Sequence, residues 1–330
     1  MSPRRKRTSE DGEIIFYRKG HSIEKLAVIV SRNLRKRFGR IQALRGVTFS
    51  VSKGSATALL GPNGAGKTTT LKILLGLLKP DSGEVEVFGM DPWRKGDKIR
   101  GIVGVLHEKP VYPQWASVRQ LIRYAARLRG LGEMDEERAI KLSGLERYAG
   151  ARISSLSRGY LQRLGIALAI LGDPELLLLD EPTANLDPAA RMEILNLISV
   201  LKEELDVTVL ISSHIIPELE MVCDSAIFIN EGLVLDQGSL DELARKHNSR
   251  AVVVIRTRNP RKLASDLIGR DYVKSVEVSS ESVKVEVMPG ELPTLESEIS
   301  RLGGKYGIER VESAAGRLQD LYWKVIGVAR

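Results

Sequence analysis

The central part of the chain, residues 26–246, alternates short apolar runs with longer amphipathic stretches. Short runs that are mostly apolar and show no alternation are typical of strands buried on both faces of a parallel sheet. Such runs occupy residues 56–60, 103–106, 176–179, 207–211 and 226–229. Helical periodicity covers residues 67–77, 118–131, 158–171 and 189–205, and strict alternation at 85–88 predicts an edge or antiparallel strand. The pattern predicts an α/β domain on a mostly parallel sheet.

The pattern changes near residues 246–249. Beyond them we predict strands at 251–255, 273–278, 282–287 and 308–312, and helices at 261–268 and 295–302. This βαββαβ order indicates a small α+β unit of the ferredoxin-like type, closed by a last helix at 318–326. Apolar residues of that helix recur at helical spacing, at Leu318, Leu321, Tyr322 and Val325. We expect that this face either packs on the unit's own sheet or serves self-association or regulation.

The net charge of +8 is concentrated at the start of the chain. Residues 1–40 hold twelve Lys/Arg and four Asp/Glu, so the remainder is balanced, and we expect no nucleic-acid partner. The run Arg4–Arg7 indicates a basic arm, residues 1–26, that is either a solvated tail or is attracted to anionic lipid or to cytoplasmic loops of a membrane partner. No apolar stretch is long enough to span a membrane, and we expect a soluble chain.

The segment Gly61-Pro-Asn-Gly-Ala-Gly66-Lys67-Thr68 follows one predicted strand and begins one predicted helix. It has the G-x-x-x-x-G-K-[ST] spacing of a phosphate-binding loop, in which glycines let backbone N–H groups surround a phosphate at a helix N-terminus. Lys67 would supply a cation to the β- and γ-phosphates. The Thr68 hydroxyl would be a ligand for Mg²⁺.

Two carboxylates, Asp180 and Glu181, follow the predicted strand 176–179. Beside a phosphate loop, we expect Asp180 to hold Mg²⁺, directly or through water. Glu181 is expected to accept a proton from an attacking water. Some twenty residues earlier, Leu156-Ser-Arg-Gly159 begins a predicted helix, with Ser157 as its N-cap.

Together these segments resemble the nucleotide-binding domain of ATP-binding-cassette (ABC) proteins, over about residues 27–246. The resemblance implies an ABC-type P-loop NTPase with a helical subdomain. The ferredoxin-like unit predicted from the pattern would then be a C-terminal accessory or regulatory domain, residues 250–330. The resemblance implies that Ser157 and Gly159 cap the γ-phosphate held by a second copy, and that Asp187 lies in a loop reaching across the dimer. It also implies that His214 contacts the γ-phosphate and that Phe38 stacks on adenine. The implied nucleotide-binding residues are Phe38, Gly61, Asn63, Gly64, Ala65, Gly66, Lys67, Thr68 and Thr69.

Two positions depart from the family pattern. Arg158 stands where a second glycine is usual, although Gly159 remains. Where the family places a Gln that binds Mg²⁺, this chain has His107-Glu108, so Glu108 is the expected ligand and Gln114 the alternative.

The resemblance implies an ATPase with MgATP as its substrate, acting as a dimer on a separately encoded, multispan membrane permease at the cytoplasmic face of the membrane. The last helix is similar to the closing helix of ATPase subunits of ABC-2-type exporters, which favours export. The alternative is a soluble ABC ATPase acting on nucleic acid or ribosomes. Such proteins usually carry two cassettes or a long coiled-coil insertion, and this sequence shows neither.

Overall fold

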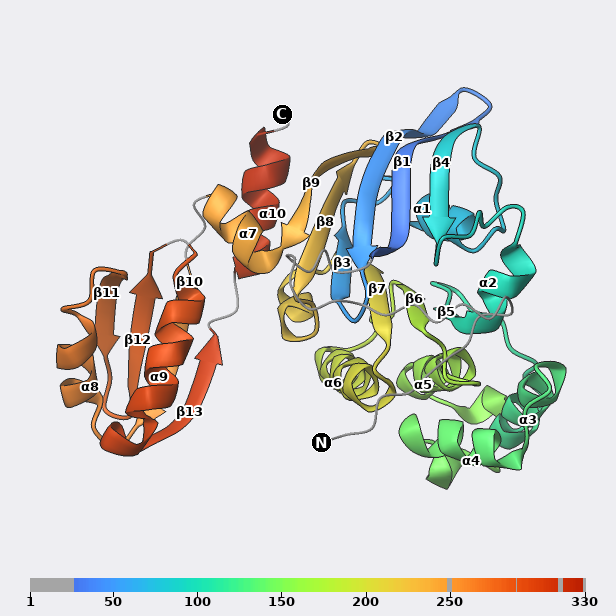
Figure 1. The fold of residues 1–330 in the computed structure, drawn as a ribbon. Helices are drawn as coiled ribbons and strands as arrows, with labels where there is room; N and C mark the ends of the chain where they lie inside the picture. The colour runs from blue at the N-terminus through green and yellow to red at the C-terminus, as the bar shows by residue number, and fades with distance from the viewer. Residues whose placement is uncertain (1–26, 248–250, 289, 314–316, 329–330) are drawn as a thin grey trace, which may run out of the picture.

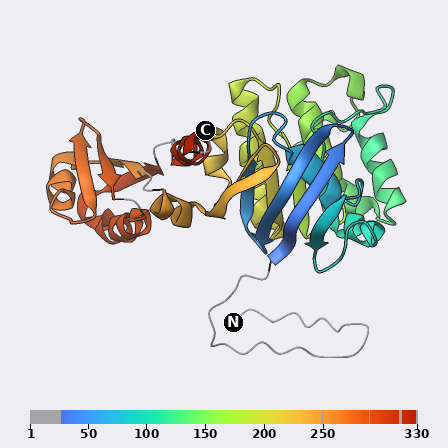
Figure 2. The ribbon, with the colours of Figure 1, turned by 90° about the horizontal axis from the view of Figure 1, so that it is seen from above.

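The computed structural model describes residues 27–247, 251–288, 290–313 and 317–328 (Figure 1). The basic arm expected at residues 1–26 lies outside these residues. The chain forms an N-terminal domain, residues 27–247, and a smaller C-terminal unit, residues 251–313, that lies beside it (Figures 1 and 2).

A six-stranded sheet runs through the N-terminal domain. Its order is β5-β6-β7-β3-β8-β9, parallel except for β9. The strands are β3 (Ala56–Leu60), β5 (Val103–Leu106), β6 (Leu176–Asp180), β7 (Thr208–Ser213), β8 (Ser225–Asn230) and β9 (Leu233–Ser239). Every residue of β3, β6 and β7 is buried, as the apolar runs predicted. Parallel strands bring their carboxyl ends to one edge, so the segments after β3, β6 and β7 meet there.

A second, antiparallel sheet has the order β2-β1-β4, with β1 (Ala27–Phe38), β2 (Ile41–Ser52) and β4 (Ser82–Val87). The prediction of an edge or antiparallel strand near residues 85–88 is confirmed by β4. Helix α1 (Lys67–Leu74) packs between the two sheets, where Leu71 and Leu74 share a core with residues of both. This sheet therefore fixes α1, and with it the phosphate loop.

Helices cover the opposite face of the six-stranded sheet (Figure 1). Helices α5 (Arg158–Ala169) and α6 (Pro188–Leu205) pack there, and α3 (Val118–Leu128) and α4 (Glu133–Leu142) form a helical subdomain beyond α5. A shorter helix, α2 (Gly96–Ile102), precedes β5. The start of α5 lies on the same side as the strand ends, because Arg158 lines one cavity with the segments that follow β5 and β6.

The C-terminal unit is a four-stranded antiparallel sheet of order β11-β12-β10-β13, with two helices on its core face. It follows α7 (Leu240–Lys246). Its elements are β10 (Ala251–Thr257), α8 (Pro260–Leu267), β11 (Val273–Val278), β12 (Ser282–Val287), α9 (Leu292–Tyr306) and β13 (Ile308–Ser313). The order and pairing are those of the predicted βαββαβ ferredoxin-like unit.

The last helix, α10 (Arg317–Val328), does not close that unit. It returns to the N-terminal domain and lies along α7, β8 and the short 3-10 helix η3 (Pro217–Met221) (Figures 1 and 2). Its apolar face belongs to the core of that domain, and the backbone N–H of Leu318 donates to Glu220 Oε1 at 2.6 Å. The expectation that α10 closes the ferredoxin-like unit is therefore wrong. Helical spacing identifies an apolar face but does not specify which surface the face covers.

Candidate active site

The loop between β3 and α1 encloses the side chain of Lys67. Its Nζ donates to the carbonyl oxygens of Gly61 at 2.7 Å and Pro62 at 3.3 Å. A Cβ at Gly61 would lie 2.1 Å from the Ile229 carbonyl oxygen, and Gly66 has a φ of +109°, so the path of the loop requires glycine at both positions. The first turn of α1 carries no acidic residue. The loop therefore presents a cation and a helix N-terminus, which suit a phosphate.

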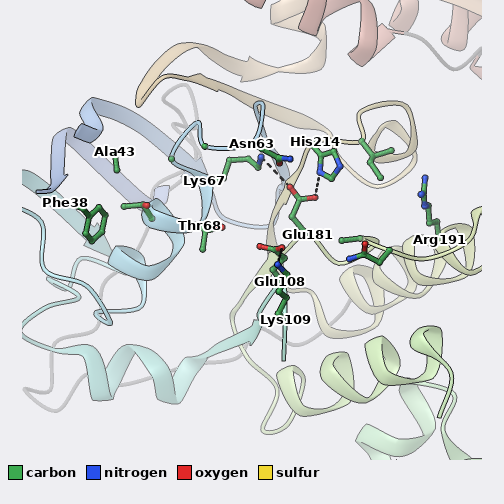
Figure 3. Close-up of a pocket in the computed structure, with 16 residues that line it drawn as sticks. Phe38, Ala43, Asn63, Lys67, Thr68, Glu108, Lys109, Glu181, Arg191 and His214 are labelled. Atoms are coloured by element: carbon green, nitrogen blue, oxygen red, sulfur yellow. Dashed lines mark hydrogen bonds and ion pairs between the residues drawn. The ribbon is translucent and has the colours of Figure 1, made fainter. Parts of the chain in front are cut away.

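A cavity of about 830 Å³, the phosphate-loop cavity, opens over this loop (Figure 3). Ten of the predicted site residues line it: Phe38, Asn63, Gly64, Gly66, Lys67, Thr68, Thr69, Glu108, Glu181 and His214. Phe38 lies at the end away from Glu181, half exposed, where a ring can stack on a planar group (Figure 3). Gly61 and Ala65 shape the loop without lining the cavity.

Glu181 lies between two other predicted catalytic residues (Figure 3). Its Oε1 is 3.4 Å from Lys67 Nζ, and its Oε2 is 2.8 Å from His214 Nδ1. Glu181 has a φ of 50°, an uncommon conformation for a residue other than glycine, and one that occurs at functional sites. A buried carboxylate bonded to a histidine at the cavity wall can orient and deprotonate a water molecule.

The preceding carboxylate, Asp180, is held by a residue that the sequence analysis missed. The Ser212 hydroxyl donates to Asp180 Oδ1 and accepts a hydrogen bond from the Glu181 backbone N–H at 3.1 Å. Ser212 is fully buried on β7, directly opposite Asp180 in the parallel pairing. The sequence shows Ser212 only as a polar residue near the end of a buried strand. The register between β6 and β7 is what places it beside Asp180.

Thr68, which lines the phosphate-loop cavity, also lines a narrow recess together with Asp180. Within the residues that the structure describes, no three His, Cys, Asp or Glu side chains form a metal-binding group. A hydroxyl and one carboxylate suit Mg²⁺, which keeps several waters and uses substrate phosphates for its other ligands. The residues present therefore fit this ion when a nucleotide is bound. Glu108 faces the larger cavity, and Gln114 lies outside it.

The predicted in-trans residues lie outside the phosphate-loop cavity of their own chain. Ser157 is the N-cap of α5, as predicted, and Asp187 is the N-cap of α6. Gln162, a buried residue of α5, donates through Nε2 to the carbonyl oxygen of Pro182 at 2.9 Å. This bond joins the helix that begins at Ser157 to the loop that follows Glu181.

Comparison with known proteins agrees with this geometry. The model of the family described as "ABC transporter" matches residues 44–184. The ABC transporter ATP-binding protein YxlF of Bacillus subtilis, itself uncharacterised, is 34% identical over 89% of this chain and 98% of its own. The chain belongs to the ABC transporter ATP-binding proteins. The Nod factor export ATP-binding protein I of Burkholderia orbicola is 33% identical over 92% of this ABC ATPase and 98% of its own length.

Solved structures match about two thirds of this ABC ATPase. CbiO1 of Clostridium perfringens, part of the transporter complex cbiONQ, is 32% identical with a TM-score of 0.60, over 66% of this chain and 90% of its own. A cassette solved as a dimer in a post-hydrolysis state with ADP and Pi is 25% identical with a TM-score of 0.56, over 64% and 98%. Within the described residues of this ABC ATPase, no helix has the length and apolar character needed to cross a membrane.

Proposed function

We propose that two copies of this ABC ATPase close around MgATP and that the closure and reopening drive export through a separately encoded membrane permease. One observation carries the dimer. Lys67, Glu181 and His214 face the phosphate-loop cavity, whereas Ser157 and Gly159 begin α5 outside it. A second copy would bring its own α5 N-terminus over the open side of the cavity. The relative solved as a dimer with ADP and Pi supports this arrangement.

The side chains divide the hydrolytic step between them. Lys67 would bind the β- and γ-phosphates through its ammonium group. The phosphates would compete there with Glu181, whose Oε1 lies 3.4 Å from Lys67 Nζ. Glu181 would then orient a water for in-line attack and accept its proton. His214, 2.8 Å from Glu181, would fix that carboxylate and contact the γ-phosphate. The helix N-terminus at Ser157 and the backbone of Gly159 of the second copy would stabilise the developing negative charge.

Mg²⁺ would be held by Thr68 and Asp180, with Glu108 of the phosphate-loop cavity as the expected third ligand, and would neutralise phosphate charge when bound. Ser212 keeps the Asp180 carboxylate in place through its hydroxyl hydrogen bond. Asp187, which caps α6 through the backbone N–H of Ala190 at 3.0 Å, fixes the loop proposed to reach the second copy.

The proposed membrane partner is supported by the surface of the helical subdomain and by the relatives. Large apolar side chains are exposed on the helical subdomain and the segment before it, at Val111 and Trp115 of that segment, Leu128 of α3 and Met134 of α4. Exposed apolar side chains in one region are typical of a surface that binds another protein. The Nod factor relative is named as an export protein, and CbiO1 belongs to a transporter complex. A multispan permease as the partner would place this ATPase at the cytoplasmic face of the membrane.

The replacement Glu181→Gln tests the closed dimer. It removes a negative charge next to the phosphates, so ATP should bind at least as tightly, while hydrolysis slows about 10²–10³-fold for lack of the base. Light scattering after size exclusion should then show a dimer in MgATP and a monomer without nucleotide. The control Glu181→Gln/Ser157→Arg should remain monomeric, because the larger side chain disrupts the α5 N-terminus. A Glu181→Gln protein that stays monomeric at tens of micromolar contradicts the proposal.

A further inference from the structure

A second cavity, of about 520 Å³, adjoins the phosphate-loop cavity beside the start of α5; we call it the subdomain cavity. Its walls come from the segment after β5, from the start of α5 and from the loop after Glu181. Glu108 lines both this cavity and the phosphate-loop cavity, so its carboxylate lies in the wall that the two share.

Glu108 and Arg158 are the two charged side chains among the described residues that line the subdomain cavity. The remaining polar side chains there, those of Gln114, Gln162 and Asn185, are neutral. Burial raises the pKa of the Tyr112 hydroxyl, which therefore also stays neutral. A single positive and a single negative side chain thus face one cavity of otherwise uncharged groups.

Among the described residues, each of the two side chains makes one polar contact, and that contact is long. Arg158 Nη1 donates to the carbonyl oxygen of Asn185 at 3.4 Å, and Glu108 Oε1 lies 3.4 Å from Nζ of the exposed Lys109. Contacts of this length between exposed groups are weak and easily exchanged. Arg158 is also the first residue of α5, where the helix N-terminus favours a carboxylate.

The negative charge of Glu108 would affect a bound nucleotide. Its carboxylate faces the same cavity as Glu181 and the phosphate loop, where a nucleotide would bring further negative charge. An uncompensated Glu108 would repel the phosphates and would bind a divalent cation more strongly.

We propose that Arg158 reaches across the subdomain cavity to form an ion pair with Glu108, and thereby neutralises and orients this carboxylate beside the nucleotide. Arg158 is then a positioning residue for Glu108 within the proposed ATPase site, on which this inference rests. The pair also connects the start of α5 to the segment after β5, so that helix and that segment move together.

A double-mutant cycle tests the pair, with Arg158→Gln, Glu108→Gln and the double replacement in the full-length chain. The readouts are the KM for MgATP and the Mg²⁺ concentration that gives half-maximal hydrolysis. Arg158→Gln alone should raise the KM about fivefold and lower the half-maximal Mg²⁺ concentration, because Glu108 loses its partner. In the Glu108→Gln background the same replacement should change both by less than about twofold.

Two further variants separate pairing from other effects. Arg158→Lys keeps the charge and should behave as the unmodified protein within about twofold. Arg152→Gln removes an exposed positive charge from the segment before α5, outside both cavities, and should change neither readout.

Two results would overturn the pair. If Arg158→Gln has the same effect with Glu108 present and with Glu108→Gln, Arg158 acts on the nucleotide of the second copy. If it has no effect in either protein, Arg158 acts neither on Glu108 nor on that nucleotide. Both outcomes presuppose that the unmodified protein hydrolyses MgATP. An inactive unmodified protein that still binds the nucleotide would contradict the proposed function instead.

Discussion

The attachment of α10 to the N-terminal domain can be tested with a single truncation of a side chain, Leu321→Ala. Leu321 is fully buried in the core formed by the six-stranded sheet and its helices. Replacing a buried leucine by alanine costs about 2–5 kcal/mol, through lost burial and the cavity that remains. We therefore expect the free energy of unfolding to fall by about 3 kcal/mol. Because a domain of this kind is stable by only about 5–15 kcal/mol, this loss should visibly lower the denaturation midpoint.

The location of the effect is more informative than its size. Helix α10 contacts η3, which begins three residues after His214. Leu321→Ala should therefore accelerate amide hydrogen exchange in η3, β8 and α7, and it should lower the rate of ATP hydrolysis by disturbing the segment that carries His214.

Two matched controls lie in the same chain. Trp323 is on the exposed side of α10, and Trp323→Ala should change stability by less than about 0.5 kcal/mol. Leu263 is fully buried in the core of the C-terminal unit, and Leu263→Ala should accelerate exchange only in β10–β13 and the helices on that sheet. The reasoning is refuted if Leu321→Ala accelerates exchange in the C-terminal unit and leaves η3 and β8 unchanged.

Three further predictions concern the rest of the chain. A chain ending after His247 should still bind ATP through its intact phosphate loop, but loss of the apolar face of α10 should lower its melting temperature and expose β8 and η3, which dye binding would report. Ser212→Ala should leave Asp180 without its hydroxyl partner and raise the half-maximal Mg²⁺ concentration several-fold, with little change if Ser212 does not position Asp180. Phe38→Ala should weaken ATP binding about tenfold but leave inorganic triphosphate binding unchanged; equal losses would exclude stacking on adenine.

The elements that the sequence predicted most closely are those whose signal is local. The bounds of β3, β5, β11 and β12 agree with those of the predicted runs. Strands β1 and β2 were missed because several register shifts and a basic stretch, Arg35-Lys-Arg37, interrupt their alternation. Within the site, the phosphate-loop pattern indicated Lys67, the strand-end carboxylates indicated Glu181, and the family resemblance implied His214. The structure brings the three side chains together. The role of Ser212 depends on which strand lies beside β6, and no local pattern contains that information.

The return of α10 makes the C-terminal unit an insertion in topological terms. It enters from α7 and leaves to α10, and these two helices contact each other on the N-terminal domain. If the unit unfolded, it would become a long loop with both ends held on the N-terminal domain. The entropic cost of closing such a loop rises only slowly with its length. The unit can vary in sequence, melt or exchange for another small domain while α10 keeps its place beside the segment that carries His214.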